Sequence, residues 1–474
     1  MPTVYTIMLL FFPVSEEYTD LAIQSFIDGL RSTFQAIPLL GGTVKTIPDG
    51  TGQVGTLAIS SPWQAVDEIV VIKELKKYNY LDLRRKQFPP SSLSQRDFVI
   101  SRFSIDSNLP VMQVQFTIIE GGIVLSPCVH HCFADGAGVT SIFQIWAAYC
   151  RGEVLNDLSS LWQPVPLLQG DEKRKIEDFP DYTYREKTHL VNKRTYKDNQ
   201  GPMSSTLNEK LMKLVVFSYI KYRSLHHCTR VVYFPHANLA RLKDTVSDEL
   251  GNVGDKWSQE TVKVVDDNRG QEVGDKQIWI STLDTLSALL FCCITQSRHV
   301  AKRKQSPTAL FTTNVNVRKH CQLPQNYIRS LVLPCNLQSP LHELTPSIRN
   351  IATQAHNLRA RLRLLDTPHV QRVASMIRSV PDVSKITSSA IDSQMNPLIM
   401  TSWRDQVTCD IDWGSQIGVK CERVRVCHYG LDGLIVVMPK YSADGGLEVV
   451  LQLRKDVMRE LEKEEVFNQF ATWR

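Results

Sequence analysis

Three observations predict a mixed α/β (α+β) fold in two domains, each a mixed sheet with flanking helices. Apolar patterns typical of strands and of helices alternate along residues 1–150, and the alternation restarts at Arg230. Between these parts, residues 170–205 are mostly polar and charged, which is typical of a crossover. We therefore expect an N-terminal domain at 1–185, a crossover linker at 186–228 and a C-terminal domain at 229–474.

The first half opens on an apolar segment, Tyr5–Pro13, which predicts a buried strand. The segment lacks the basic leading region and the cleavage site of a signal peptide, and Glu16 and Glu17 follow at once. A helix is expected from Glu17 to Gln35, because apolar residues recur there at helical spacing, and Pro38 ends it. No run reaches the roughly 18 apolar residues that span a membrane.

A hairpin and a helix complete this half. Leu109–Glu120 predicts a strand, Gly121-Gly122 a tight turn, and Gly122–Val129 a second, buried strand. A stripe of apolar residues at helical spacing then runs from Val139 to Cys150. The segment that joins this strand to this helix is therefore held between two rigid elements.

That segment is the run His130-His131-Cys132-Phe133-Ala134-Asp135-Gly136. It separates an imidazole from a carboxylate by three residues and closes with a glycine, a pattern expected by chance about 0.03 times in such a chain. Histidine suits proton transfer because its ordinary pKa of about 6.5 lies near neutrality. The run therefore predicts a catalytic histidine; two ordinary histidines beside a turn aspartate are the alternative interpretation.

The second half repeats the alternation of strands and helices. We expect a strand at Arg230–Phe234 and a helix at Ala237–Val246. A polar loop or insertion should follow at Ser247–Gln277. A second helix should begin at Ser281-Thr282-Leu283-Asp284 and continue to Ser297. We then expect a helix capped by Thr345 with Pro346 in its first turn, a hairpin of Leu434–Met438 and Leu447–Leu453 around Asp444-Gly445-Gly446, and a closing helix from Lys455.

Composition excludes several classes of function. With 43% apolar and 22% charged residues and a net charge of +5, the chain is typical of a soluble globular protein without a polyanionic partner. It contains no glycine-rich nucleotide-binding run. Its eleven cysteines form no Cys-x-x-Cys pair. Zinc ligation around Cys128–Cys132 lacks a second, separate ligand pair, so we expect no metal and reduced thiols in the cytoplasm.

The chain resembles the BAHD acyltransferases, and within them the fungal branch related to trichothecene 3-O-acetyltransferase. The resemblance covers nearly the whole chain, and its motifs stand in the family's order: Thr6–Val44, His131-x-x-x-Asp135-Gly136, Ser281-Thr282-Leu283-Asp284, Asn316-Val317-Arg318, Thr401-Ser402-Trp403 and Asp410-Ile411-Asp412-Trp413-Gly414. One motif alone would be a weak signal, whereas the two signatures in order are specific. The second signature departs from the family pattern at Ile411 and Asp412.

The resemblance implies two domains similar to chloramphenicol acetyltransferase, with a channel between them. His131 would act as the base on the acceptor hydroxyl, and Asp135 would turn away from the channel to pair with Arg318. Gly136 would permit the close turn. His131 rather than His130 has the family's spacing to Asp135, and neighbouring strand residues point to opposite faces.

Other motifs would support the site. Thr401 and Trp403 match residues that hydrogen-bond the oxyanion or position the acyl group, although Trp403 alone would be interpreted as a core aromatic. Asp410, Trp413 and Gly414 would form a remote structural loop that shapes the CoA channel.

Two further segments have alternative interpretations. Ser281 and Thr282 match residues that contact the pantetheine of CoA, but helix capping explains them equally well. Lys302-Arg303-Lys304 could meet CoA phosphates, but a solvated helix end is the simpler interpretation.

We therefore expect an acyl-CoA-dependent O-acyltransferase, most simply an O-acetyltransferase, that modifies a hydroxyl of an apolar secondary metabolite such as a terpenoid, alkaloid or polyketide. Acyl-CoA would be a co-substrate rather than a resident cofactor. The other partner would be a small alcohol, with no nucleic acid or membrane, and the protein a cytoplasmic monomer. Two alternatives are an amide-forming enzyme like the condensation domains, which share the doubled histidine at His130, and a binding protein without turnover.

Overall fold

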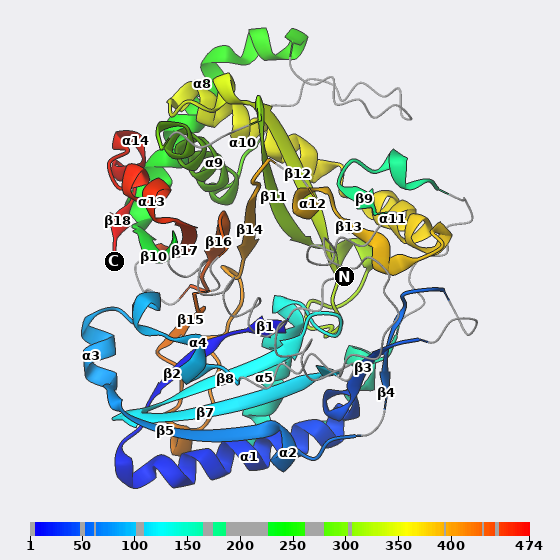
Figure 1. Ribbon diagram of the computed structural model, residues 1–474, viewed down its shortest axis with the longest axis vertical. Helices are drawn as coiled ribbons and strands as arrows, with labels where there is room; N and C mark the ends of the chain where they lie inside the picture. The colour runs from blue at the N-terminus through cyan, green and yellow to red at the C-terminus, as the bar shows by residue number, and fades with distance from the viewer. Residues whose placement is uncertain are drawn as a thin grey trace, which may run out of the picture.

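A computed structural model of the chain describes residues 5–47, 53–60, 63–100, 109–164, 174–185, 226–260, 279–301, 306–392, 395–428, 431–440 and 445–474. Most of the expected linker at 186–228, Lys302–Lys304 and Asp444 lie outside the described residues. The described residues form two large sheets, each built mainly from one half of the chain (Figure 1). No helix among them is long and apolar enough to cross a membrane.

The N-terminal sheet has the strand order β15-β2-β8-β7-β5, and β1 also pairs with β8. Its strands are β1 (Tyr5–Ile7), β2 (Leu9–Pro13), β5 (Val70–Asn79), β7 (Met112–Glu120), β8 (Gly122–His130) and β15 (Arg423–Arg425). Strands β5 and β7 run parallel and the remaining neighbours antiparallel, so the sheet is mixed, as the sequence predicts. A small sheet of β3 (Thr43–Thr46), β4 (Leu57–Ser60) and β6 (Leu109–Pro110) accompanies it.

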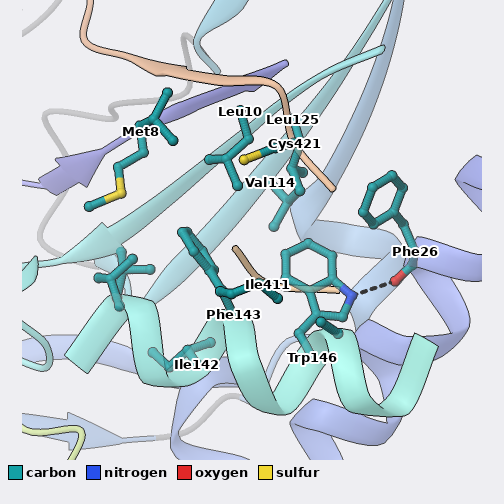
Figure 2. Packing of buried hydrophobic residues seen from close by; sticks show 14 of the residues in the cluster. Met8, Leu10, Phe26, Val114, Leu125, Ile142, Phe143, Trp146, Ile411 and Cys421 are labelled. Carbon is teal, nitrogen blue, oxygen red and sulfur yellow. Dashed lines mark hydrogen bonds between the residues drawn. The ribbon is translucent and has the colours of Figure 1, made fainter. Parts of the chain in front are cut away.

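Two long helices, α1 (Thr19–Ala36) and α5 (Gly136–Cys150), pack together against one face of this sheet (Figure 1). Their apolar stripes meet in the core, where the Trp146 indole donates a 2.7 Å hydrogen bond to the Phe26 carbonyl oxygen (Figure 2). The short helices of this half are α2 (Val66–Ile69), α3 (Tyr80–Arg85), α4 (Gln95–Phe98) and α6 (Ser159–Trp162). The expected strand, hairpin and helix around the histidine run are confirmed.

The C-terminal sheet has the order β12-β11-β14-β16-β17-β10-β18. Its strands are β10 (His227–Phe234), β11 (Thr308–Asn316), β12 (Val332–Pro340), β14 (Leu398–Ser402), β16 (Leu434–Val437), β17 (Leu447–Arg454) and β18 (Thr472–Trp473). Strand β14 runs parallel to β11 and β16, whereas β11–β12 and β16–β17 are antiparallel. This sheet is therefore also mixed.

Helices cover one face of the C-terminal sheet (Figure 1). They are α8 (His236–Glu260), α9 (Thr282–Val300), α10 (Ile348–Arg363), α13 (Lys455–Leu461) and α14 (Glu465–Asn468). Along β16, Ile435 and Val437 join the core under these helices, whereas Val436 joins the core of the N-terminal half. Strand alternation thus turns the second face of this sheet toward the N-terminal half. The remaining elements are β9 (Tyr182–Tyr184), α11 (Thr367–Ser379), β13 (Ile386–Ser388) and α12 (Ser389–Asp392).

Two sequence predictions about this half are wrong. The helix expected at Ala237–Val246 continues to Glu260, because half-buried Leu250 follows Val246 by one helical turn and extends the apolar stripe. The helix expected to start at Thr345 starts at Ile348 instead. Ser347 is its cap and accepts a 3.2 Å hydrogen bond from the Asn350 backbone N–H.

Candidate active site

The histidine run lies where β8 ends and α5 begins, as the sequence predicts. His130 is the last residue of β8, and His131 and Cys132 are half-buried in the turn that follows. The Phe133 and Ala134 backbone N–H groups donate to the His130 carbonyl oxygen at 2.9 and 3.3 Å, so the turn folds back on the strand end. His131 is therefore presented by a short turn that is held at both ends.

The two histidines have different surroundings. The His130 side chain is fully buried, and its Nδ1 accepts a 3.2 Å hydrogen bond from the Cys132 backbone N–H. Its ring meets the Tyr5 ring edge-on, with centroids 5.1 Å apart. Burial, and secondarily the neighbouring His131, lowers the pKa of His130 to about 4, so the His130 imidazole is neutral near pH 7. Half-buried His131 is the more accessible of the two.

The neighbouring thiols are not activated. Burial raises the pKa of the Cys132 thiol to about 11 and also raises the pKa of Cys128, so both remain protonated at neutral pH. No group of three or more His, Cys, Asp or Glu side chains in the described part of the chain is arranged to hold a metal ion.

The pair expected between Asp135 and Arg318 is present. Arg318 Nη1 and Nη2 donate to the two Asp135 carboxylate oxygens at 2.9 and 2.8 Å, and both side chains are buried. Asp135 also caps α5 by accepting the Gly138 N–H at 2.9 Å, and it accepts the Leu331 N–H at 2.8 Å. Both Asp135 carboxylate oxygens therefore accept hydrogen bonds from the C-terminal half, and Oδ1 also accepts one from α5.

Arg318 in turn holds the segment that follows it. Its Nε donates to the Tyr327 carbonyl oxygen and its Nη2 to the Arg329 carbonyl oxygen, both at 2.8 Å. This segment packs closely on α5, since a Cβ atom on Gly138 would lie only 1.8 Å from the Ile328 carbonyl oxygen. The need for glycine at 138 was not foreseen from the sequence, although the Gly136-x-Gly138 spacing is visible there.

The Thr401–Trp403 segment, at the end of β14, also lies beside the start of α5. Thr401 pairs with Val436 of β16 and is half-buried, and the Trp403 backbone N–H donates to the Val437 carbonyl oxygen at 2.8 Å. A Cβ atom on Gly136 would lie 2.9 Å from the Trp403 Nε1 atom. The glycine therefore leaves room for this indole at the start of α5.

The second signature lies in a crossover that the sequence analysis did not foresee. Residues 403–426 leave the C-terminal sheet after β14, and β15 then pairs with β2 of the N-terminal sheet. Trp413 is fully buried there, with ring centroids of Phe26 and Trp146 each 5.4 Å away. Figure 2 shows Ile411 and Cys421 from the same crossover within this core.

The two departures in this signature are accommodated. Ile411 is buried in the N-terminal core, and Asp412 is exposed. The Asp412 carboxylate accepts the Gly414 N–H at 2.8 Å, which closes a local turn. Gly414 has a φ of +96°, a conformation that favours glycine. Asp410 is exposed at the start of this turn.

Ser281 caps α9, one of the two alternatives expected for it. Its hydroxyl accepts the Asp284 N–H at 3.2 Å, and the Asp284 carboxylate accepts the Ser281 N–H at 2.6 Å. This is a capping box. The Asp284 carboxylate is also paired with Arg359. Half-buried Thr282 is the first residue of the helix.

Two mixed sheets are thus joined by a crossover, and a half-buried histidine precedes a helix whose cap residue pairs with an arginine of the other half. Residues 77–467, most of the chain, match the Transferase family. The chain therefore belongs to this family, the BAHD acyltransferases, and the family expected from the sequence is confirmed.

Similar proteins include fungal acetyltransferases. The eremophilane O-acetyltransferase ORF8 of Penicillium roqueforti strain FM164 is 23% identical over 100% of this chain and 97% of its own length. The O-acetyltransferase anaAT of Neosartorya fischeri is 24% identical over 88% of this chain and 84% of its own. TRI101 of F. sporotrichioides, solved with coenzyme A and T-2, has a TM-score of 0.74 at 21% identity, over 99% of this chain and 96% of that one. The two-sheet fold expected from the sequence is confirmed.

Proposed function

We propose that this protein is an acyl-CoA-dependent O-acyltransferase, most simply an O-acetyltransferase, that esterifies a hydroxyl of an apolar secondary metabolite such as a terpenoid, alkaloid or polyketide. The observation that carries the proposal is the half-buried His131 beside the buried Asp135–Arg318 pair at the junction of the two halves. The names of the similar proteins support it: several are O-acetyltransferases, and one was solved with coenzyme A and T-2.

In the proposed reaction His131 takes the proton of the acceptor hydroxyl as its oxygen attacks the thioester carbonyl carbon. The carbon–sulfur bond then breaks, and His131 returns the proton to the departing thiolate, so the products are the ester and free CoA. Base catalysis of this kind contributes about 10²- to 10⁴-fold in rate. No acyl-enzyme is needed, which agrees with the raised pKa of Cys132.

The other site residues are assigned supporting roles. Thr401 and Trp403 orient the acyl group or stabilise the oxyanion, and Asp135 with Gly136 fixes the turn that carries His131. The signature loop at 410–414 holds the crossover in place through buried Trp413. For Ser281 the capping box with Asp284 supports a structural role, and any contact of Ser281 or Thr282 with pantetheine is secondary.

We also propose that the enzyme works as a cytoplasmic monomer on small molecules, without a nucleic-acid or membrane partner. All eleven cysteines are free thiols, which agrees with a reducing compartment. The condensation-domain alternative rests on the doubled histidine, but His130 is fully buried and its Nδ1 is engaged by a backbone N–H. His130 is therefore poorly placed to act on a substrate.

The test is release of free thiol from acetyl-CoA in the presence of candidate alcohols. His131→Ala should fold normally, still bind acetyl-CoA and lose at least about 10²-fold in turnover, because the base is missing. His130→Ala is the matched control and should lose much less.

Thermal melts of both variants with acetyl-CoA separate lost catalysis from lost folding or binding. If His130→Ala loses activity while His131→Ala keeps it, the assignment of the base is wrong. If both variants remain active, histidine base catalysis is excluded. Binding of acetyl-CoA without turnover of any alcohol would favour a binding protein.

A further inference from the structure

Two cysteines of the crossover meet at the base of the loop at 410–420, which carries Trp413. Cys409 and Cys421 flank this loop, and both are buried in the N-terminal core. The loop closes on itself between them, because the Trp413 backbone N–H donates to the Val419 carbonyl oxygen at 2.6 Å. Both thiols are free, and they are hydrogen-bonded to each other. The fold therefore brings together two sulfur atoms that the loop separates in sequence.

The contact between the two thiols is asymmetric. The Cys421 Sγ–H faces two acceptors, the Thr408 carbonyl oxygen at 3.4 Å and the Cys409 sulfur. The hydrogen bond from Cys421 lowers the pKa of the Cys409 thiol, because it stabilises the thiolate. The same hydrogen bond raises the pKa of Cys421. Cys409 is therefore the sulfur that ionises more readily, and Cys421 keeps its proton.

Charged side chains and exposure add to this difference. The positive charges of Arg423 and Arg425, both on β15, lower the pKa of the Cys409 thiol further, whereas burial and the Asp410 carboxylate oppose them. Every other one of the eleven cysteines, all within the described residues, has a raised pKa. Cys409 is 7% exposed and Cys421 only 2%, so a small oxidant reaches Cys409 first. A thiolate beside a second thiol is the arrangement that oxidants attack reversibly.

We propose that Cys409 and Cys421 are a site of reversible oxidation by hydroperoxides, in which Cys409 reacts first and Cys421 closes a disulfide across the base of the loop. The Cys409 thiolate attacks one oxygen of hydrogen peroxide, the O–O bond breaks, and Cys409 becomes a sulfenic acid. The released hydroxide takes up the proton that Cys409 lost and becomes water. The inference does not depend on the proposed function.

The second step joins the two sulfur atoms. The Cys421 sulfur attacks the Cys409 sulfur, so the S–S bond forms and the S–O bond of the sulfenic acid breaks. The hydroxide that leaves takes the Cys421 proton and becomes a second water. Two thiols thus lose two electrons, which reduce the peroxide, and a thiol reductant reverses the change.

The test is mass spectrometry of the folded, full-length protein after hydrogen peroxide treatment and alkylation of the remaining thiols. Trypsin cleaves after Lys420, so Cys409 and Cys421 fall on separate peptides. A disulfide between them joins these peptides until dithiothreitol separates them. The joined peptides should form at least about 10-fold faster than Cys150 is oxidised. Cys150 is half-buried and thus more exposed, but burial raises its pKa to about 12.

Three variants separate the two steps. In Cys421→Ser the serine hydroxyl still donates to Cys409 but cannot form a disulfide, so the reaction should stop at a sulfenic acid that dimedone traps. Cys409→Ser should leave Cys421 reduced. Cys150→Ser is the matched control and should form the joined peptides at the wild-type rate. The inference is overturned if Cys409 stays reduced while Cys150 is oxidised, or if the joined peptides form only in urea, where the folded arrangement is lost.

Discussion

At the scale of single residues, the two adjacent histidines differ because the strand ends between them. His130 still belongs to β8 and points into a packed face, where its Nδ1 accepts the Cys132 N–H. Its Nε2 is buried without a partner, so the fold favours the neutral ring and opposes a second proton. His131, one residue later, is half-buried. A one-residue difference in sequence thus separates a buried histidine with a lowered pKa from the proposed base.

The depressed pKa of His130 makes stability depend on pH. The unfolded chain binds a proton at His130 near its ordinary pKa of about 6.5, whereas the folded protein does so only near 4. Stability from this group is therefore present above pH 6.5 and is lost as the pH falls toward 4, by about 3 kcal/mol in total. His130→Asn keeps an acceptor for the Cys132 N–H but does not titrate, so it should lose about 3 kcal/mol less stability than the wild-type protein over this range.

The measurement is urea unfolding of the wild-type protein and His130→Asn at several pH values from 7 to 4. The other titrating groups are common to both proteins, so a difference in the pH dependence of their unfolding free energies comes from His130. Identical pH dependence in the two proteins would show that the buried histidine does not resist protonation.

At the scale of elements, one carboxylate determines how α5 starts and what it contacts. Asp135 caps the helix, pairs with Arg318 and accepts the Leu331 N–H, so β8, α5 and the segment after β11 meet at one side chain. Its loss would leave a buried guanidinium without a counter-charge.

Asp135→Ala should lower the free energy of unfolding by about 3–5 kcal/mol, because the Arg318 charge stays buried. The double variant Asp135→Ala/Arg318→Met should recover part of this loss, since no unpaired charge remains. As a control, Asp405→Ala breaks an exposed pair with Arg404 and should cost at most about 1 kcal/mol. Denaturant unfolding of the three variants provides the comparison. A double variant less stable than Asp135→Ala would contradict the account.

Local periodicity predicted the strands and helices that flank the site. It failed for the start of α10, which a capping residue determines, and for the end of α8, where the residues are mostly polar. The spacing of Ile23, Phe26 and Leu30 was enough to place α1. The start of α10 was misplaced because Asn350 Nδ2 donates to the Thr345 hydroxyl and carbonyl oxygens, an arrangement that a Thr-Pro pair does not reveal. The Asp135–Arg318 contact came from the family motif, since no local pattern relates residues 183 positions apart.

At the scale of the whole molecule, the two halves are joined by a crossover as well as by the histidine turn. The segment at 403–426 carries Trp413 into the N-terminal core and places β15 beside β2. The domain bounds at 1–185 and 229–474 remain a prediction.

A buried cluster of charged side chains lies at the junction between the two sheets. Arg425 of β15 donates to the Glu448 carboxylate of β17 at 2.6 Å, and both side chains are fully buried. Arg474 donates to the other Glu448 oxygen at 2.7 Å. Arg425 also donates to the Phe88 and Gln87 carbonyl oxygens at 3.0 and 2.8 Å, so it is bound to the loop after α3 as well as to the C-terminal sheet.

Glu448→Gln should destabilise the whole protein by about 3–5 kcal/mol, because it keeps the shape of the side chain but leaves the Arg425 charge buried without its partner. Glu74→Gln is the matched control: Glu74 pairs with Lys76 on the exposed surface, so its loss should cost at most about 1 kcal/mol. The check is the shift in the urea midpoint of both variants beside the wild-type protein. Because the cluster joins the two sheets rather than contacting a substrate, Glu448→Gln should keep its turnover at temperatures where it is folded. Equal stability of the two variants would show that the junction does not depend on this pair.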